Sequence, residues 1–242
     1  MLETIIFLLS IIHSIFGIGL LAIGTPLLLL LDYDFLIILK ILLPCSILIS
    51  TFQICKTKNI LKADKTIIHR SVPYVFLGAL IIYFFSSNIN FKMTIGFSIL
   101  IVLFLKTFLK KKIDLLIRKN KTILISFTGF FHGLTNTGGS LISLIFQSLK
   151  KNKYEVQGCI AYTYFLYALI QYFLLNFFLK KLLIDYDSVG LLMFACVGYF
   201  LGNIIFKKID FNFFLNILNL IVFFSAIYLI FSEFQIIFHL TL

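Results

Sequence analysis

Long apolar stretches separated by short charged loops fill almost the whole chain and constrain its fold more than any other feature. Hydrophobic residues make up 61% of the 242 residues and charged residues only 13%, with a mean hydropathy of +1.08. This composition lies far outside the range of soluble domains. A segment of about 20 apolar residues can cross the roughly 30 Å hydrocarbon core as a helix. We therefore expect an all-α integral membrane protein.

Charged and turn residues divide the chain into about eight apolar segments, each close to the length of a transmembrane helix. The first segment directly follows Glu3 and has neither a basic n-region nor a small-residue cleavage site. We therefore expect it to be a retained span and not a signal peptide. No soluble domain is expected. The predicted spans are residues 4–31, 35–55, 71–89, 93–109, 122–149, 157–179, 188–206 and 211–232.

Basic residues flank the apolar segments, as topology signals do, and account for the net charge of +11. This placement argues against a nucleic-acid partner. The loops 55–70, 106–121 and 180–187 hold 14 of the 21 Lys and Arg residues, so we expect them in the cytoplasm. With eight spans in the plasma (inner) membrane, both termini would also be cytoplasmic. Lys150 and Lys207, with their basic neighbours, weaken this asymmetry.

The chain repeats itself with a period of about 120 residues, which indicates a duplication. His13 matches His132 at an offset of 119 residues, and Gly78 matches Gly198 at 120 residues. Repeats of four spans would share one orientation, whereas a re-entrant first element would make them inverted. The predicted organisation is a first transmembrane repeat at 1–112, a basic cytoplasmic linker at 113–121 and a second repeat at 122–242.

The first span of each repeat is 28 residues long and is interrupted by glycine and small polar residues. Broken backbone at membrane depth is tolerated only where protein buries it or where it lines a cavity. A half-helix restarting at Pro26 or after Gly139 would present unpaired N–H groups that suit an oxyanion. Helix packing is the other explanation of the glycines. The predicted substrate-binding residues at the breaks are Gly17, Gly19, Gly24, Thr25, Pro26, Thr135, Asn136, Thr137, Gly138, Gly139 and Ser140.

The ionisable side chains beside the breaks are His13 and His132, which could couple proton and anion movement or simply hydrogen-bond neighbouring helices. Lys40, early in the second segment, either snorkels to the interface or faces the anion. All ten Asp and Glu residues lie in loops or near segment ends, so a relay through buried carboxylates is not expected. The four cysteines show no CxxC spacing, so we predict no disulfide, metal or cofactor.

The glycine-rich phrases at the two breaks resemble the signatures of the sulfite exporter TauE/SafE family. They read His13-Ser14-x-Phe16-Gly17-x-Gly19-x-x-x-x-Gly24-x-Pro26 and, in degenerate form, His132-Gly133-x-x-Asn136-x-Gly138-Gly139. The resemblance covers nearly the whole chain. It implies a two-repeat membrane protein that moves sulfite, organosulfonates or related sulfur-containing organic anions. The chain departs from the pattern at Leu20 and Leu21, where more glycine is typical, and its second phrase has no proline.

We therefore expect a secondary carrier that binds a small anion between the halves, with access alternating as the halves move. No Walker A signature occurs, so an ion or substrate gradient is the simplest energy source, with proton coupling one option. An anion channel and a non-transporting membrane scaffold are the alternatives. An enzyme is not expected, because neither Ser14 nor Ser140 has an orienting acid in reach. The expected partners are the anion and the lipid bilayer, and a homo-oligomer is left open.

Overall fold

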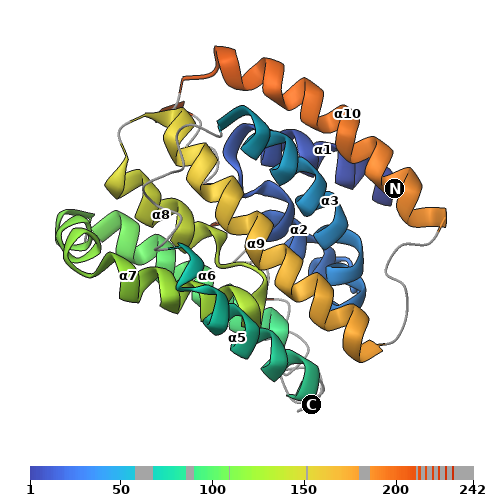
Figure 1. The fold of residues 1–242 in the computed structure, drawn as a ribbon, viewed down its shortest axis with the longest axis horizontal. Coiled ribbons are helices and arrows are strands. Elements are labelled where there is room, and N and C mark those ends of the chain that lie inside the picture. Colours follow the sequence, from blue (N-terminus) through green and yellow to red (C-terminus); the bar gives the residue numbers. More distant parts are fainter. Residues whose placement is uncertain are drawn as a thin grey trace.

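The computed structural model describes residues 1–57, 68–85, 90–108, 110–150, 152–179 and 186–210, with isolated positions between 212 and 231. Within these ranges the regular structure is entirely α-helical, as predicted, and the helices pack side by side (Figure 1). They are α1 (Leu2–Phe16), α2 (Gly19–Leu30), α3 (Phe35–Thr57), α5 (Val72–Phe85), α6 (Phe91–Phe108), α7 (Lys110–Thr135), α8 (Gly139–Leu149), α9 (Lys153–Leu179) and α10 (Tyr186–Lys208).

Each predicted break ends one helix and begins another. Gly17, between α1 and α2, has a φ of 78°, and Asn136, between α7 and α8, has a φ of 60°. Both values lie in the left-handed region, which glycine adopts freely and asparagine more readily than most residues. The two positions are 119 residues apart, so the helices stop at equivalent points of the duplicated sequence. The prediction that both first segments are broken is confirmed.

The helices on either side of each break fold back on one another. A Cβ atom at Gly24 of α2 would lie 2.9 Å from Leu9 Cδ1 of α1, whereas fifteen positions along a straight helix span about 22 Å. In the second half, a Cβ atom at Gly138 would lie 3.0 Å from the carbonyl oxygen of Thr128 in α7. The two segments predicted as single interrupted spans are therefore helical hairpins.

The first hairpin restarts earlier than the sequence suggested. α2 begins at Gly19, and Pro26 lies inside the helix instead of opening it. The reason is that the N–H of Ala22 already bonds to the carbonyl of Ile18 at 3.1 Å, so the first turn forms before the proline is reached. Pro26 then leaves the Ala22 carbonyl without its usual helical donor. The second hairpin restarts at Gly139, as predicted.

The repeat counterparts α3 and α9 lie side by side and run in opposite directions (Figure 1). Gln53, near the end of α3, and Gln157, near the start of α9, both donate to the carbonyl of Ser14, at 3.1 and 2.8 Å. At the other end, Leu36 at the start of α3 and Leu174 near the end of α9 line the same crevice. The repeat-matched helices α3 and α9 are therefore antiparallel, whereas four-span copies of one orientation would place them in parallel.

The two halves interlock, because α1 packs along α10 and α7 packs along α5. Small residues at matching positions allow both pairs of backbones to approach closely. A Cβ atom at Gly198 would lie 2.8 Å from Ser10 Cβ, and one at Gly202 would lie 2.7 Å from Ser14 Cβ. A side chain at Gly78 of α5 would overlap the backbone of α7. Close packing thus accounts for these three glycines.

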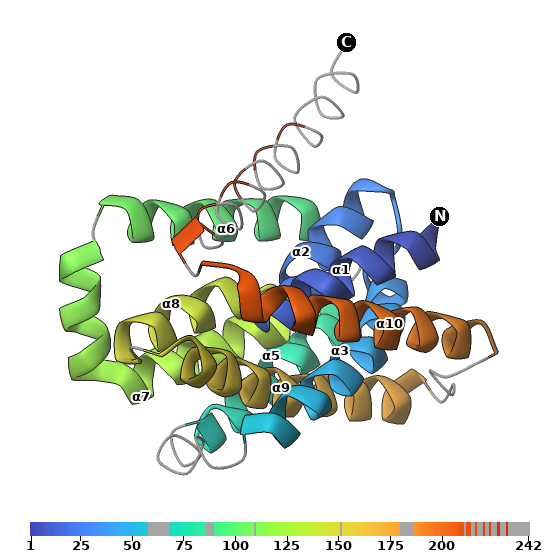
Figure 2. The same cartoon turned by 90° about the horizontal axis from the view of Figure 1, so that it is seen from above.

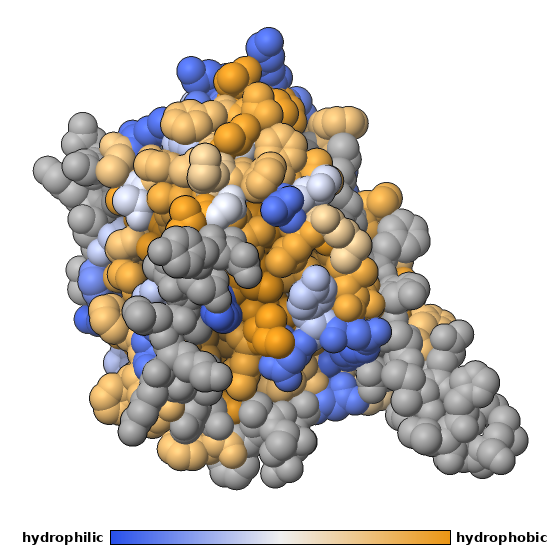
Figure 3. Space-filling view, turned by 90° about the vertical axis from the view of Figure 1, so that its right-hand side faces the viewer, coloured by the Kyte–Doolittle hydropathy of each residue, from blue (hydrophilic) through white to orange (hydrophobic). Residues whose placement is uncertain are grey.

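Among the described residues, α3, α9 and α10 are the helices long and apolar enough to cross a membrane, while α1, α2 and most of α5 form shorter apolar helices. Large side chains of α10 are exposed, including Met193 at 67% and Phe200 at 59%. Figure 3 shows a face on which hydrophobic residues predominate and hydrophilic residues form smaller groups. Such a surface suits contact with lipid. The predicted span 211–232 lies outside the described residues except at isolated positions, so eight spans are not confirmed.

Charged residues connect the helix ends. The predicted linker 113–121 forms part of α7, which bends at Asn120 (Figure 2).

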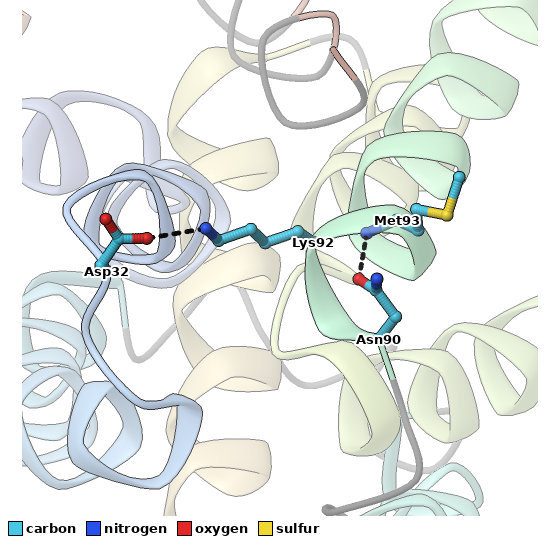
Figure 4. A network of polar contacts seen from close by, with 4 residues as sticks. All are labelled: Asp32, Asn90, Lys92 and Met93. Carbon is cyan, nitrogen blue, oxygen red and sulfur yellow. Dashed lines mark hydrogen bonds and ion pairs between the residues drawn. The ribbon is translucent and has the colours of Figure 1, made fainter. Parts of the chain in front are cut away.

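Lys92, at the start of α6, forms an ion pair of 2.8 Å with Asp32, which follows α2. Asn90 accepts a hydrogen bond from the N–H of Met93 at 3.0 Å (Figure 4). The Asp32 side chain is 83% exposed, so the pair ties α6 to the first hairpin with little stabilisation.

Candidate functional site

A hydrogen bond joins the two hairpins at a fully buried point. Asn136 Nδ2 donates to Thr25 Oγ1 at 2.9 Å, and both residues have 0% exposure. The Asn136 backbone is fixed by its N–H, which bonds to the His132 carbonyl at 2.8 Å. Beside it, the hydroxyl oxygens of Thr135 and Thr137 are 2.9 Å apart. The structure thus brings together four residues that were predicted from separate halves of the sequence.

His13 is held by hydrogen bonds that also fix the start of α2. Its Nδ1 accepts the N–H of Leu20 at 3.2 Å, so the ring proton is on Nε2, which lies 3.4 Å from Ser50 Oγ. The N–H groups in the first turn of a helix have no helical acceptor, and the imidazole of His13 supplies an acceptor for one of them. His13 therefore closes the first hairpin as a helix cap.

His132 is equally buried, but its ring contacts are mainly aromatic. Neither ring nitrogen has a hydrogen bond of good geometry to a described residue, although the Gln171 side chain is close enough to bond to the ring. The ring centroid is 5.2 Å from that of Tyr164 and 5.1 Å from that of Tyr167. Tyr164 also contacts His13 edge to face, with the centroids 5.8 Å apart. Tyr164 of α9 therefore lies between the two histidines.

The start of α8 adjoins the same tyrosine. A side chain at Gly139 would overlap the Tyr164 hydroxyl, and a Cβ atom at Gly138 would lie 2.6 Å from His132 Cβ. Only glycine lets the tyrosine and the histidine reach the helix end. α8 has no side-chain cap, and the Tyr164 hydroxyl has no hydrogen-bond partner among the described residues. The arrangement presents a helix N-terminus and a phenol hydroxyl to one buried point, which suits an anion.

Two glutamines at repeat-matched positions donate hydrogen bonds to carbonyl groups at the ends of the helices before the breaks. Gln53 Nε2 donates to the carbonyls of His13 and Ser14, at 3.1 Å each. Gln171 Nε2 donates to the carbonyls of His132 and Gly133, at 3.4 Å each. The His13 and His132 carbonyls also accept the backbone N–H of Gly17 and of Asn136, at 2.7 and 2.8 Å, so the glutamines are second donors to them. Through these bonds α3 and α9 stabilise the ends of α1 and α7.

The other predicted site residues lie in different surroundings. Cβ atoms at Gly17 and Gly24 would lie 2.9 Å from Ile160 Cγ2 and 3.1 Å from Leu42 Cδ1, and a side chain at Gly19 would overlap the α1 backbone. These three glycines let neighbouring helices pack. Lys40 is in the second turn of α3 and is partly exposed, unlike the residues above. The side chain of Ser140 lies outside the described part of the chain.

Tyr164 and both glutamines were not among the site residues predicted from the sequence. Tyr164, Tyr167 and Gln171 are spaced by three and four positions on α9, so they form a polar stripe on one face of an apolar helix. That spacing and the repeat match of Gln53 with Gln171, 118 residues apart, were the available signals. The described ranges contain no buried Asp, Glu, Lys or Arg, so the site there is formed by neutral groups and histidine.

No curated protein and no solved structure matches the chain. The sequence model of one family, described as Sulfite exporter TauE/SafE, matches residues 4–229 of the 242. The match begins in the first turn of α1 and includes α2 to α10 in full, and it confirms the resemblance drawn from the glycine-rich phrases. Proteins of this kind are membrane transporters and not enzymes. The chain therefore belongs to the TauE/SafE family of sulfite exporters.

Proposed function

We propose that the protein is a secondary carrier of small anions such as sulfite and organosulfonates, with the anion bound between the two hairpins. The observation that carries this proposal is the buried hydrogen bond from Asn136 to Thr25, which joins the two inverted halves. A carrier of this design needs a site shared by both halves, because relative movement then exposes the site to either side of the membrane. In the loaded state the anion takes the place of Thr25 as acceptor for the Asn136 amide.

The chemistry of the buried site favours an anion over a cation. An anion that enters it loses its hydration and needs hydrogen-bond donors in return. Asn136, the Tyr164 hydroxyl and the uncapped start of α8 are such donors, and the described part of the site contains no carboxylate. The helix N-terminus adds about half a positive charge.

The inverted repeats support a topology in which each hairpin enters and leaves the membrane on the same side. Each half then crosses three times, through α3, α5 and α6 in the first half and through α9, α10 and segment 211–232 in the second. In this arrangement one side of the membrane carries every Lys and Arg of the chain except Lys40, Lys92, Lys180 and Lys181.

The charge asymmetry of this topology is larger than that of eight spans, which would divide the basic loops between both sides. By the positive-inside rule the basic side is cytoplasmic. Met1 and the loop 31–34 then lie on the opposite face of the plasma membrane. This proposal replaces the cytoplasmic termini expected from eight spans.

Uptake of radiolabelled sulfite into proteoliposomes tests the carrier function. We expect saturable uptake by the wild type and a loss of roughly tenfold or more in Asn136→Ala, because a hydrogen bond to a charged group contributes about 1.5–3 kcal/mol. Gly190→Ala is the matched control, since its added Cβ would meet no atom within 4 Å beyond its chain neighbours and its own helix backbone. Absence of sulfite, sulfate and ethanesulfonate flux with correctly inserted wild-type protein would refute the carrier function, and flux that never saturates would indicate a channel.

A further inference from the structure

The two histidines occupy equivalent places in the repeats, but their hydrogen bonds differ. Nδ1 of His13 accepts the Leu20 N–H, and its Nε2 carries the ring proton beside Ser50. Both nitrogens of His13 are therefore engaged. A proton added at Nδ1 would point at the Leu20 N–H. Two donors would then face each other, and the cap at the start of α2 would be lost.

His132 has no such constraint. Its exposure is 0%, and neither Nδ1 nor Nε2 has a well-formed hydrogen bond among the described residues. Two other buried polar atoms near the same break also have no partner there, Asn136 Oδ1 and the Tyr164 hydroxyl, and Gln171 Oε1 has none apart from the His132 ring. Buried polar groups are nearly always paired, so a cluster of unpaired ones needs water, an ion or a ligand to satisfy it.

An incoming anion brings a negative charge, which the groups of this cluster must compensate. A buried charge is costly unless an opposite charge accompanies it. No Lys or Arg is buried in the described ranges, so a proton taken up by histidine is the available compensation. Of the two histidines, only His132 has a nitrogen free to accept one.

We propose that His132, and not its repeat counterpart His13, takes up the proton that accompanies the anion through the membrane. The proposal rests on the carrier function above and assigns its coupling residue. A proton from water on one side adds to a free ring nitrogen, and the same nitrogen releases it on the other side as the anion leaves. Gln171 Oε1 accepts a hydrogen bond from the charged ring, and the Tyr164 hydroxyl donates to the anion at the start of α8.

Among the described groups around His132, no other side chain is a candidate to take up the proton. α9 presents Tyr164 and Tyr167, and the Tyr167 hydroxyl is already bonded to Ser71 Oγ at 2.7 Å. From α5, Tyr74 is 45% exposed and lies on the outer face. α8 contains no titratable residue. From α6, Lys92 is paired with Asp32, and the side chain of Lys106 lies outside the described part.

The test compares His132→Asn with His13→Asn in proteoliposomes under an imposed pH gradient, with the membrane potential held at zero. An asparagine amide oxygen can replace Nδ1 as acceptor for the Leu20 N–H, so His13→Asn keeps the cap and removes only the titratable ring. One coupled proton drives roughly tenfold accumulation for each pH unit of gradient. We expect wild type, His13→Asn and Gly190→Ala to accumulate sulfite about tenfold more per pH unit than His132→Asn. Sulfite itself takes up a proton near neutral pH, so variants are compared at identical pH values.

Binding supplies a second readout if His132→Asn carries no flux. Sulfite binding is measured as the rise in melting temperature that sulfite causes at pH 6 and at pH 8. At pH 6 this rise should be larger in wild type and in His13→Asn than in His132→Asn. An unchanged gradient response in His132→Asn overturns the proposal, as does a loss confined to His13→Asn, or sulfite binding in wild type and His132→Asn with the same pH dependence. Absence of wild-type flux instead counts against the carrier function itself.

Discussion

Substitution of Gly139 by alanine tests the contact between α8 and Tyr164 on which the site depends. The added methyl group would overlap the Tyr164 hydroxyl, and the tyrosine is fully buried between two histidine rings, so it has little room to move. Overpacking of this kind costs about 1–3 kcal/mol. The better helix propensity of alanine offsets about 0.5–1 kcal/mol. We expect a net destabilisation of about 1–2 kcal/mol, whereas Gly190→Ala should be neutral or slightly stabilising.

A double-mutant cycle separates the clash from other effects. Tyr164→Leu shortens the side chain, so adding Gly139→Ala to it should cost little, with a coupling of about 1–2 kcal/mol. The free energy of unfolding is measured by SDS titration in mixed micelles and followed by circular dichroism, because the chain contains no tryptophan. Equal stabilities of Gly139→Ala and Gly190→Ala, or strictly additive effects in the cycle, would show that Tyr164 does not lie on the start of α8.

Three further predictions address the hairpins, the helix pairs and the topology. Asn136→Asp should lower sulfite uptake at least as much as Asn136→Ala, since it places a carboxylate where the anion binds; equal uptake by Asn136→Asp and wild type would argue against the site. Gly202→Ala should destabilise the protein by about 1–3 kcal/mol in the same SDS titration, because the added Cβ would meet the backbone and Ser14 of α1; no loss would contradict the close packing of α1 on α10. In a cysteine-free variant, an impermeant maleimide added outside intact cells should label Asp34→Cys and not Lys119→Cys, and the reverse pattern would reject the proposed orientation.

The apolar class and the helical content could both be predicted from the sequence, because they depend on composition and on the length of the apolar segments, and the duplication stays a prediction from regularly spaced matches. The two breaks were also predictable, since glycine and asparagine tolerate the left-handed backbone found at Gly17 and Asn136. Four of the predicted site residues, Thr25, Thr135, Asn136 and Thr137, do come together. The glycines at 17, 19 and 24 could not be sorted into binding and packing positions, because that depends on which side chain lies opposite.

Tyr164 and Gln171 could not be identified as site residues from the sequence, for a related reason. Phenylalanine and tyrosine are abundant throughout this chain, so a single tyrosine in an apolar helix carries no signal of its own. Its role follows from its position between His13 and His132, which belong to helices 119 residues apart in the sequence. Only packing of α9 against both hairpins creates that position.

The sequence by itself determined that this is a membrane protein, that two of its apolar segments are broken and that it resembles the TauE/SafE family, and it predicted two related halves. The tertiary structure decided that each broken segment turns back as a hairpin, that α3 and α9 are antiparallel and that the two histidines have different hydrogen bonds. The physical reason is that hydropathy measures only the length of apolar chain, and 28 apolar residues look the same as one span or as two short helices. The direction after Gly17 or Asn136 is set by one backbone angle and by contacts such as Gly24 on Leu9, which join residues far apart in the sequence.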